Sequence, residues 1–328
     1  MSEPSASSLL SEGFASRPDA LAEIREQVGD PRSGPGARSY RVTMLGGVSV
    51  EILPERGLDL GSLWYDNVPY AWRSALGPRG GSRDPRGEGW IGRFGGGALA
   101  TCGFDNIGPA RDGFGLHGSH HLTPAEDVAV GRTPDGDVLV TGVIDSASVF
   151  GRQVEVRREI RVRAGAPRVE VRDTVVNRGV VPAAIPVLYH VNLGAPLVLP
   201  GTAVAVDAAT HEPRDPEAAA VPWSVYPEPS DAVGESVWEH AGLVADAAGV
   251  ARAQVTSPTG RTATIEWRAS EQPRCVQWIY PTRGGWALGI EPTNAPLFGP
   301  DRTGTHAGAP VLGPGEGTTT GVTIDVSR

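Results

Sequence analysis

Residues 153–163 read QVEVRREIRVR, and residues 168–177 read RVEVRDTVVN. In the first stretch, the apolar residues from Val154 to Val162 alternate with charged residues, and the valines that begin at Val169 repeat this pattern. A period of two with one apolar face is typical of antiparallel strands that cover a core on one side. The two stretches therefore predict a pair of long antiparallel strands.

The first stretch also contains the densest run of arginines, which includes Arg157, Arg158 and Arg161. These residues are interleaved with Glu155 and Glu159. Mixed charges along a strand are typical of a solvated face, so we expect this run to lie in water rather than on nucleic acid.

The same reasoning extends outward along the chain. Leu21, Ile24 and Val28 have helical spacing after Pro18, so we expect one short helix over residues 18–28. Residues 1–17 are predicted to be a disordered tail, residues 208–234 a long loop, and residues 18–328 a single all-β domain, a large antiparallel β-sandwich. Further predicted strands cover residues 39–45, 47–53, 57–65, 137–145, 183–193, 261–267, 275–281, 286–291 and 318–326.

The composition narrows the possible functions. The chain has 328 residues with a net charge of −9, and its sequence contains no lysine. Schiff-base and P-loop chemistry both require a lysine amine and are excluded. The acidic balance argues against a nucleic-acid partner, and the sequence offers neither an apolar membrane span nor a secretory leader. We therefore expect a cytoplasmic protein without nucleic-acid or membrane partners.

Four polar residues are candidates for catalysis or ligand binding because of their positions in the predicted strands and loops. His190 interrupts an apolar strand, and Glu291 closes another strand before a Pro-Thr-Asn turn. His117 lies among glycines that allow another group to approach closely, and Arg56 lies between predicted strands. His117 and His190 are each also compatible with a purely structural role. If the Glu291 carboxylate is buried, its pKa rises towards the range in which it can take and return a proton.

Four motifs occur in a characteristic order: VGD at 28–30, RGLDLG at 56–61, TCGFDNIG at 101–108 and GLHG at 115–118. From about residue 22 to the C-terminus, the chain resembles the galactose mutarotase (aldose 1-epimerase) superfamily. It is most similar to a poorly characterised branch of aldose-epimerase-like proteins. The resemblance implies a β-sandwich that epimerises an aldose, or a sugar derivative, at the anomeric carbon without a cofactor.

The resemblance also implies roles for individual residues. His117 corresponds to the histidine that orients the sugar near its ring oxygen. His190, in YHVNLG, corresponds to the general acid, and Glu291 corresponds to the general base. Arg56 resembles the arginine that contacts the substrate.

Three further residues are candidates for substrate contact. Asp105 precedes the loop of His117. Of the adjacent pair His120 and His121, one is expected to join His117, since neighbouring strand residues point to opposite faces; we take it to be His121. Trp278 is a candidate to stack on a pyranose face, although a place in the sandwich core is the more ordinary interpretation of a tryptophan. The other tryptophans with these two possibilities are Trp64, Trp72, Trp90 and Trp286.

Two other functions stay open. A metal held by His117, His121 and His190 would suit a metal-dependent isomerase or lyase that acts on a keto-sugar or glycoside. A sugar-binding protein without catalysis would keep the pocket but would not need both His190 and Glu291. The expected partner is a small-molecule sugar, and a homodimer is possible on this sequence.

Overall fold

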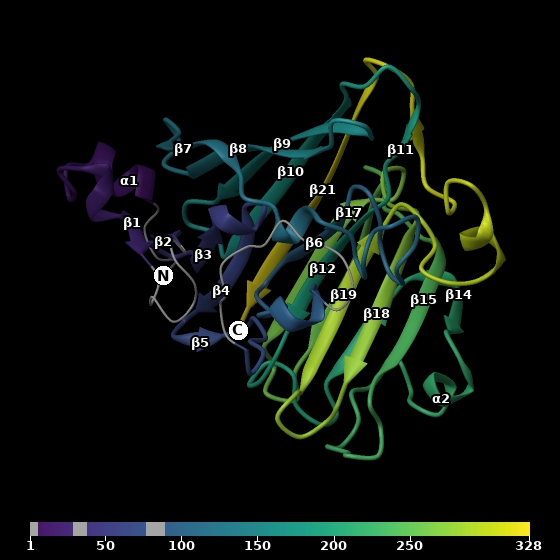
Figure 1. Ribbon diagram of the computed structural model, residues 1–328. Coiled ribbons are helices and arrows are strands. Elements are labelled where there is room, and N and C mark those ends of the chain that lie inside the picture. Colours follow the sequence, from purple (N-terminus) through teal and green to yellow (C-terminus); the bar gives the residue numbers. More distant parts are fainter. Residues whose placement is uncertain (1–5, 29–37, 77–88) are drawn as a thin grey trace.

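The computed structural model describes residues 6–28, 38–76 and 89–328. The chain folds into large antiparallel sheets packed as a sandwich (Figure 1), which confirms the all-β prediction. Buried side chains from the three largest sheets form one continuous apolar core.

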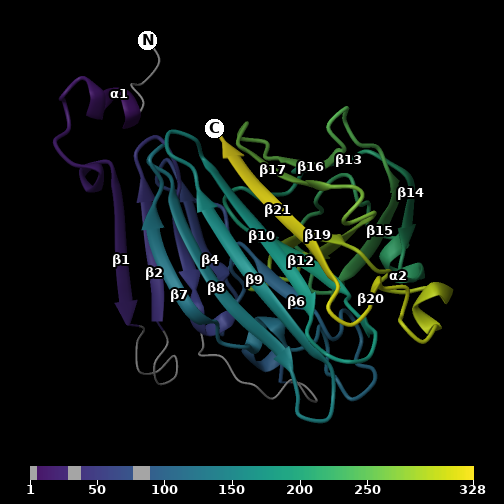
Figure 2. The same ribbon diagram turned by 90° about the horizontal axis from the view of Figure 1, so that it is seen from above.

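The largest sheet has eight strands and contains the two stretches that predict the fold. β9 (Gln153–Val162) and β10 (Arg168–Asn177) pair with Val169 opposite Val162. Figure 2 shows β8, β9, β10 and β21 side by side, with the C-terminus at the end of β21. The sheet order is β13 (Ala203–Val206), β16 (Val250–Thr256), β17 (Thr262–Arg268), β21 (Gly317–Ser327), β10, β9, β8 (Val138–Ala147) and β7 (Glu126–Arg132).

A six-stranded sheet packs against the eight-stranded sheet and lies in front of it in Figure 1. In its strand β12, Val187, Tyr189 and Val191 face the shared core, whereas Leu188 and His190 face the other side. The outer face is therefore free to carry a site. The sheet order is β14 (Ala208–Pro213), β15 (Ser236–Leu243), β18 (Arg274–Tyr280), β19 (Ala287–Thr293), β12 (Val187–Leu193) and β6 (Ala100–Gly103).

The N-terminal region forms a five-stranded sheet. Its strands are β1 (Ala22–Val28), β2 (Arg38–Met44), β3 (Ser49–Leu53), β4 (Asp59–Tyr65) and β5 (Val68–Pro69), in that order. A further two-stranded sheet pairs β11 (Ala183–Ala184) with β20 (Val311–Leu312).

The helix predicted over residues 18–28 is wrong. Pro18–Ala20 forms a single 3-10 turn, and β1 follows as a strand paired with β2 from Ala22 opposite Met44 onward. Residues 22–28 form a strand despite their helical spacing because β2 supplies a hydrogen-bonding partner, which the local sequence does not reveal. The short N-terminal helix lies earlier, at α1 (Ala6–Ser11), inside the stretch predicted to be disordered.

The long loop predicted over residues 208–234 is also more structured than expected. It contains β14 and the short helix α2 (Pro216–Ala219), whose first turn is capped by the Asp215 carboxylate. Among the described residues, no helix has the length and apolar character needed to cross a membrane.

Candidate active site

The centre of the site is a histidine and a glutamate on neighbouring strands. β12 and β19 pair with Val191 opposite Ile290, a register that sets His190 opposite Glu291 on the outer face of the six-stranded sheet. His190 Nε2 lies 3.2 Å from Glu291 Oε1, and both side chains are almost fully buried. The two residues predicted to act as acid and base therefore lie in direct contact.

Gly289 makes room for this pair. A Cβ atom at this position would lie 2.5 Å from Glu291 Oε1 and 3.1 Å from both His190 Cε1 and Trp278 Cβ. Glycine is thus needed on this face of β19 because the two functional side chains lean across its backbone.

Burial controls the protonation of the pair. Burial raises the pKa of Glu291 well above its ordinary value, and the charge of Glu235 raises it further. Burial lowers the pKa of His190 well below its ordinary value, with added repulsion from His117 and His121. Both shifts favour the uncharged forms, a carboxylic acid beside a neutral imidazole.

His117 reaches the same place from a loop. Its backbone is left-handed, with φ of 60°, and Gly118 follows where a side chain would collide with Asp105 and Asn106. Its Nδ1 accepts a hydrogen bond from the Gly108 backbone N–H at 3.2 Å. Burial lowers the pKa of His117 to about 3, so the ring is neutral and its proton sits on Nε2. His117 therefore offers one fixed hydrogen-bond donor, with its ring centre 5.8 Å from that of His190.

His117, His190 and Glu291 all line an open pocket of about 830 Å³. This size lies within the range of small-molecule sites. The wall is largely aromatic, and Trp90 stacks on Phe94 at 4.2 Å while Trp278 stacks on Tyr280 at 5.4 Å. The aromatic lining residues are Trp72, Trp90, Phe94, Trp278, Tyr280 and Phe298.

The other predicted substrate contacts lie elsewhere, apart from Trp278. Arg56 and His121 line a separate cavity of about 10 Å³, room for roughly one water molecule. Asp105 lines a third pocket and accepts hydrogen bonds from the hydroxyl and backbone N–H of Ser119, which anchors the loop that follows His117. The structure thus brings together four of the seven predicted site residues.

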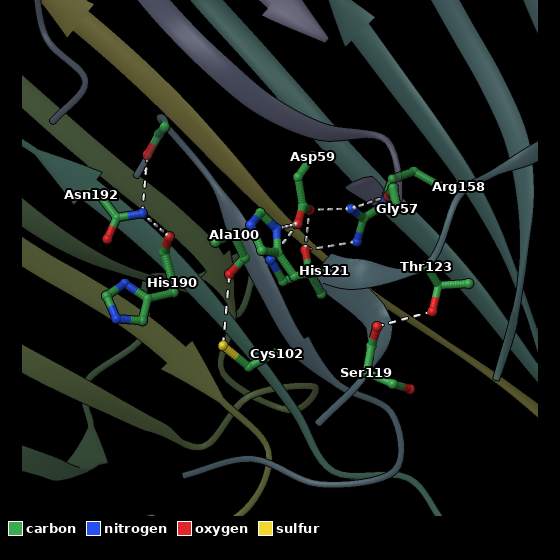
Figure 3. A network of polar contacts seen from close by, with 12 residues as sticks. Gly57, Asp59, Ala100, Cys102, Ser119, His121, Thr123, Arg158, His190 and Asn192 are labelled. Atoms are coloured by element: carbon green, nitrogen blue, oxygen red, sulfur yellow. Dashed lines mark hydrogen bonds and ion pairs between the residues drawn. The ribbon is translucent and has the colours of Figure 1, made fainter. Parts of the chain in front are cut away.

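His121 belongs to a buried polar network around Asp59 of the RGLDLG motif (Figure 3). Asp59 accepts hydrogen bonds from His121 Nδ1 at 2.6 Å and from Thr101 Oγ1 at 2.7 Å, and it pairs with Arg158 at 2.6 Å. Arg158 also pairs with Asp173 at 2.7 Å. Burial opposes ionisation of Asp59, but the His121 hydrogen bond and the Arg158 charge lower its pKa to about 2.

The expectation that the arginine run is solvated is wrong for Arg158. Its guanidinium is completely buried, whereas Arg157 beside it is largely exposed. The alternation itself puts Arg158 on the apolar face of β9, between Val156 and Ile160. A charge is tolerated there because Asp59 and Asp173 neutralise it.

Most lining residues were not among the predicted ones, and Phe94, Glu235 and Tyr280 are examples. Tyr280 could have been found, since it lies two residues after Trp278 on one strand and so shares its face. Glu235 contacts Trp278 Nε1 at 3.0 Å from a loop, and no local pattern points to it. Of the other tryptophans considered for stacking, Trp72 and Trp90 line the pocket, whereas Trp64 and Trp286 do not.

The described residues contain no group of three or more His, Cys, Asp or Glu side chains arranged to hold a metal ion. Of the three histidines considered for a metal, His117 and His190 line the pocket, while His121 Nδ1 is engaged by Asp59.

Comparison with known proteins shows to which family the chain belongs. Over residues 34–326 it matches the family described as a domain of unknown function, DUF4432. The chain belongs to this family. No curated protein matches this DUF4432 chain.

Solved structures share the fold. A protein of Klebsiella pneumoniae subsp. pneumoniae MGH 78578, provisionally named an aldose 1-epimerase, is 21% identical, with a TM-score of 0.84 over 92% of this chain and 83% of that one. A galactose mutarotase-like protein from Clostridium acetobutylicum is 16% identical, with a TM-score of 0.64 over 94% and 99%. A galactose mutarotase-like protein from Lactobacillus casei ATCC 334 is 15% identical, with a TM-score of 0.58 over 86% and 97%. The superfamily resemblance is confirmed for the fold of this DUF4432 protein.

Proposed function

We propose that this protein is a carbohydrate isomerase that interconverts the α and β anomers of an aldose without a cofactor. The observation that supports this most is the contact of 3.2 Å between His190 and Glu291 at the wall of a ligand-sized pocket. A coupled acid and base are what the reaction requires, because it removes one proton and adds another.

In the proposed reaction, the proton of Glu291 first passes to His190. The Glu291 carboxylate then takes the proton of the anomeric hydroxyl while the His190 imidazolium protonates the ring oxygen. The bond between C1 and the ring oxygen breaks, and the open-chain aldehyde forms. Rotation about the C1–C2 bond exposes the other face of the aldehyde, and the reverse steps close the ring. The pair gains one proton and loses one in each half, so its single shared proton suffices.

His117 has a positioning role in this scheme. Its neutral ring donates one hydrogen bond through Nε2, and the Gly108 N–H holds the ring in place. A fixed donor can orient the sugar at its ring oxygen without competing for the proton that His190 delivers.

The direct test is the rate of anomer equilibration of freshly dissolved α-D-glucose and α-D-galactose, followed by polarimetry or proton NMR at neutral pH. Acceleration that is lost in Glu291→Gln would support the proposal. The spontaneous rate with every aldose tested, from a folded protein, would contradict it. Acceleration that survives in Glu291→Gln would remove the assignment of the base.

A further inference from the structure

One hydrogen-bond donor in the wall of the pocket is left unused by the protein. Trp90 lines the pocket and is only 4% exposed, yet its Nε1 has no hydrogen-bond partner among the described residues. Trp72 Nε1, by contrast, donates to the Gly285 carbonyl at 2.6 Å. Trp278 Nε1 donates to Glu235 at 3.0 Å. Of the tryptophans that the structure describes in this wall, Trp90 is thus the one whose N–H is unpaired.

The ring of Trp90 packs beside the histidines of the site. Its centre lies 4.5 Å from the ring centre of His117 and 6.4 Å from that of His190. On another side it stacks on Phe94 at 4.2 Å. The unused donor therefore belongs to a side chain that adjoins the residues proposed to orient the sugar and to protonate its ring oxygen.

The unpaired N–H of Trp90 carries a free-energy cost, because a buried donor has lost its bonds to water without replacement. A ligand that supplies an acceptor removes this cost when it binds. An indole N–H can only donate, so the matching ligand atom is an acceptor such as a hydroxyl oxygen. Sugars carry such oxygens on most of their carbon atoms.

We infer that Trp90 is a substrate-binding residue whose N–H donates a hydrogen bond to a sugar hydroxyl oxygen next to the reacting bond. This inference rests on the proposed function, in which Glu291 binds the anomeric hydroxyl while His117 and His190 face the ring oxygen. On a hexopyranose, the hydroxyl groups that flank these two positions are the one at C2, beside the anomeric carbon, and the one at C6, on the side of the ring oxygen. The acceptor is therefore the C2 or the C6 oxygen.

Trp238 provides a matched control. Its Nε1 is also buried without a hydrogen-bond partner among the described residues, but its ring lies in the core between the sheets and is not part of the described wall of the pocket. Trp90→Phe and Trp238→Phe each remove one unpaired indole N–H and keep an aromatic ring. Only the first should change how a sugar binds, because the inference depends on the place of the donor in the pocket.

Deoxy sugars test the contact through kcat/KM for anomerisation of D-glucose and D-galactose and of their 2-deoxy and 6-deoxy forms. We expect Trp90→Phe to lower kcat/KM for the parent sugars about 3- to 10-fold, the usual contribution of a hydrogen bond between uncharged groups. This loss should disappear for the deoxy form that lacks the acceptor oxygen, and Trp238→Phe should show no loss with any sugar. No loss in Trp90→Phe, an equal loss for parent and both deoxy forms, or the same pattern in Trp238→Phe would overturn the inference.

A spectroscopic signal separates this inference from the proposed function. In the full-length protein with ¹⁵N-labelled tryptophan, the indole N–H signal of Trp90 is identified by its loss in Trp90→Phe. Saturating D-glucose or D-galactose should move this signal downfield, as a proton moves when it gains a hydrogen bond, and should leave the Trp238 signal in place.

The combined outcomes distinguish the two ideas. A shift of the Trp90 signal without anomerisation would keep Trp90 as a binding residue while the proposed reaction fails. Anomerisation without a shift would overturn the inference and leave the proposed function standing. The absence of both, in a folded protein, would overturn the inference and the proposed function together.

Discussion

At the scale of single residues, the candidate site centres on two buried side chains in contact. His190 and Glu291 are both buried, and each is disfavoured in its charged form. At 3.2 Å the two side chains are close enough for a proton to pass between them, and such a transfer leaves no isolated charge. The contact between His190 and Glu291 makes the pair suitable for acid–base catalysis, although neither residue alone indicates such a role.

Removal of either partner should abolish most of the activity. We expect Glu291→Gln and His190→Ala each to lower the anomerisation rate by about 10²- to 10⁴-fold, the usual contribution of a positioned proton-transfer group. The measurement is kcat by polarimetry, with circular dichroism to check that the variants are folded. Near-wild-type rates in either variant would exclude the acid–base roles.

The buried carboxyl group should also make stability depend on pH. Because the pKa of Glu291 is raised above its ordinary 4.5, the folded chain keeps a proton that the unfolded chain releases. This contribution is complete below pH 4.5 and is lost as the pH rises towards the folded pKa. Relative to Glu291→Gln, wild type should therefore lose up to about 1.4 kcal/mol of unfolding free energy per pH unit.

Urea unfolding of both proteins at several pH values from 5 to 8.5 measures this difference. The variant cannot ionise at this position, so it controls for every other titrating group. A difference that stays constant across the range would mean that Glu291 is already ionised in the folded protein.

At the scale of elements, the neighbouring strands β12, β19 and β18 build the site through register. Antiparallel pairing sets His190 beside Glu291, and Trp278 beside Gly289. Side chains on one face of adjacent strands come within contact distance in this arrangement. The missing side chain at Gly289 is what allows the two functional groups to fill that space.

A methyl group at Gly289 should displace the pair while leaving the sheet in place. We expect Gly289→Ala to lower kcat by about 10²-fold, since a shift of about 1 Å has this effect on positioned groups. Gly131→Ala in β7 is the matched control, because nothing lies within 4 Å of its added Cβ atom. Comparable kcat values for both alanine variants would show that Gly289 does not set the geometry.

At the scale of the whole molecule, a buried arginine joins separate sheets. Arg158 in β9 contacts Asp59 in β4 and Asp173 in β10, and it donates to the Gly57 carbonyl at 3.0 Å. β4 belongs to the five-stranded sheet, whereas β9 and β10 belong to the eight-stranded sheet. The network therefore connects two sheets through charges that cannot be left unpaired.

Loss of this arginine should destabilise the entire fold. We expect Arg158→Met to lower the free energy of unfolding by about 3–5 kcal/mol, because two buried carboxylates lose their counter-charge. Arg157→Ala is the matched control, since its ion pair with Glu155 is at the surface and should contribute at most about 1 kcal/mol. Chemical denaturation of both variants checks this; similar losses would contradict the role of Arg158.

The sequence by itself determined the class of fold and singled out the two residues that the structure brings into contact. Alternation in β9 and β10 is a local property, because successive side chains on a strand point to opposite faces whatever the partner strand is. His190 and Glu291 could be named from their motifs. The same alternation already set Arg158 on the apolar face, although the charge pattern suggested otherwise.

Only the tertiary structure decided which residues share the pocket. Residues 22–28 form a strand, not a helix, because β2 pairs with them. Arg56 and Asp105 belong to the motifs and His121 lies three residues after GLHG, yet these residues line other cavities or join buried networks. Loops bring Glu235 and Phe94 to the wall from distant parts of the chain. Strand pairing and loop packing bring together residues that are far apart in sequence. Local sequence patterns do not show which of these distant residues come into contact.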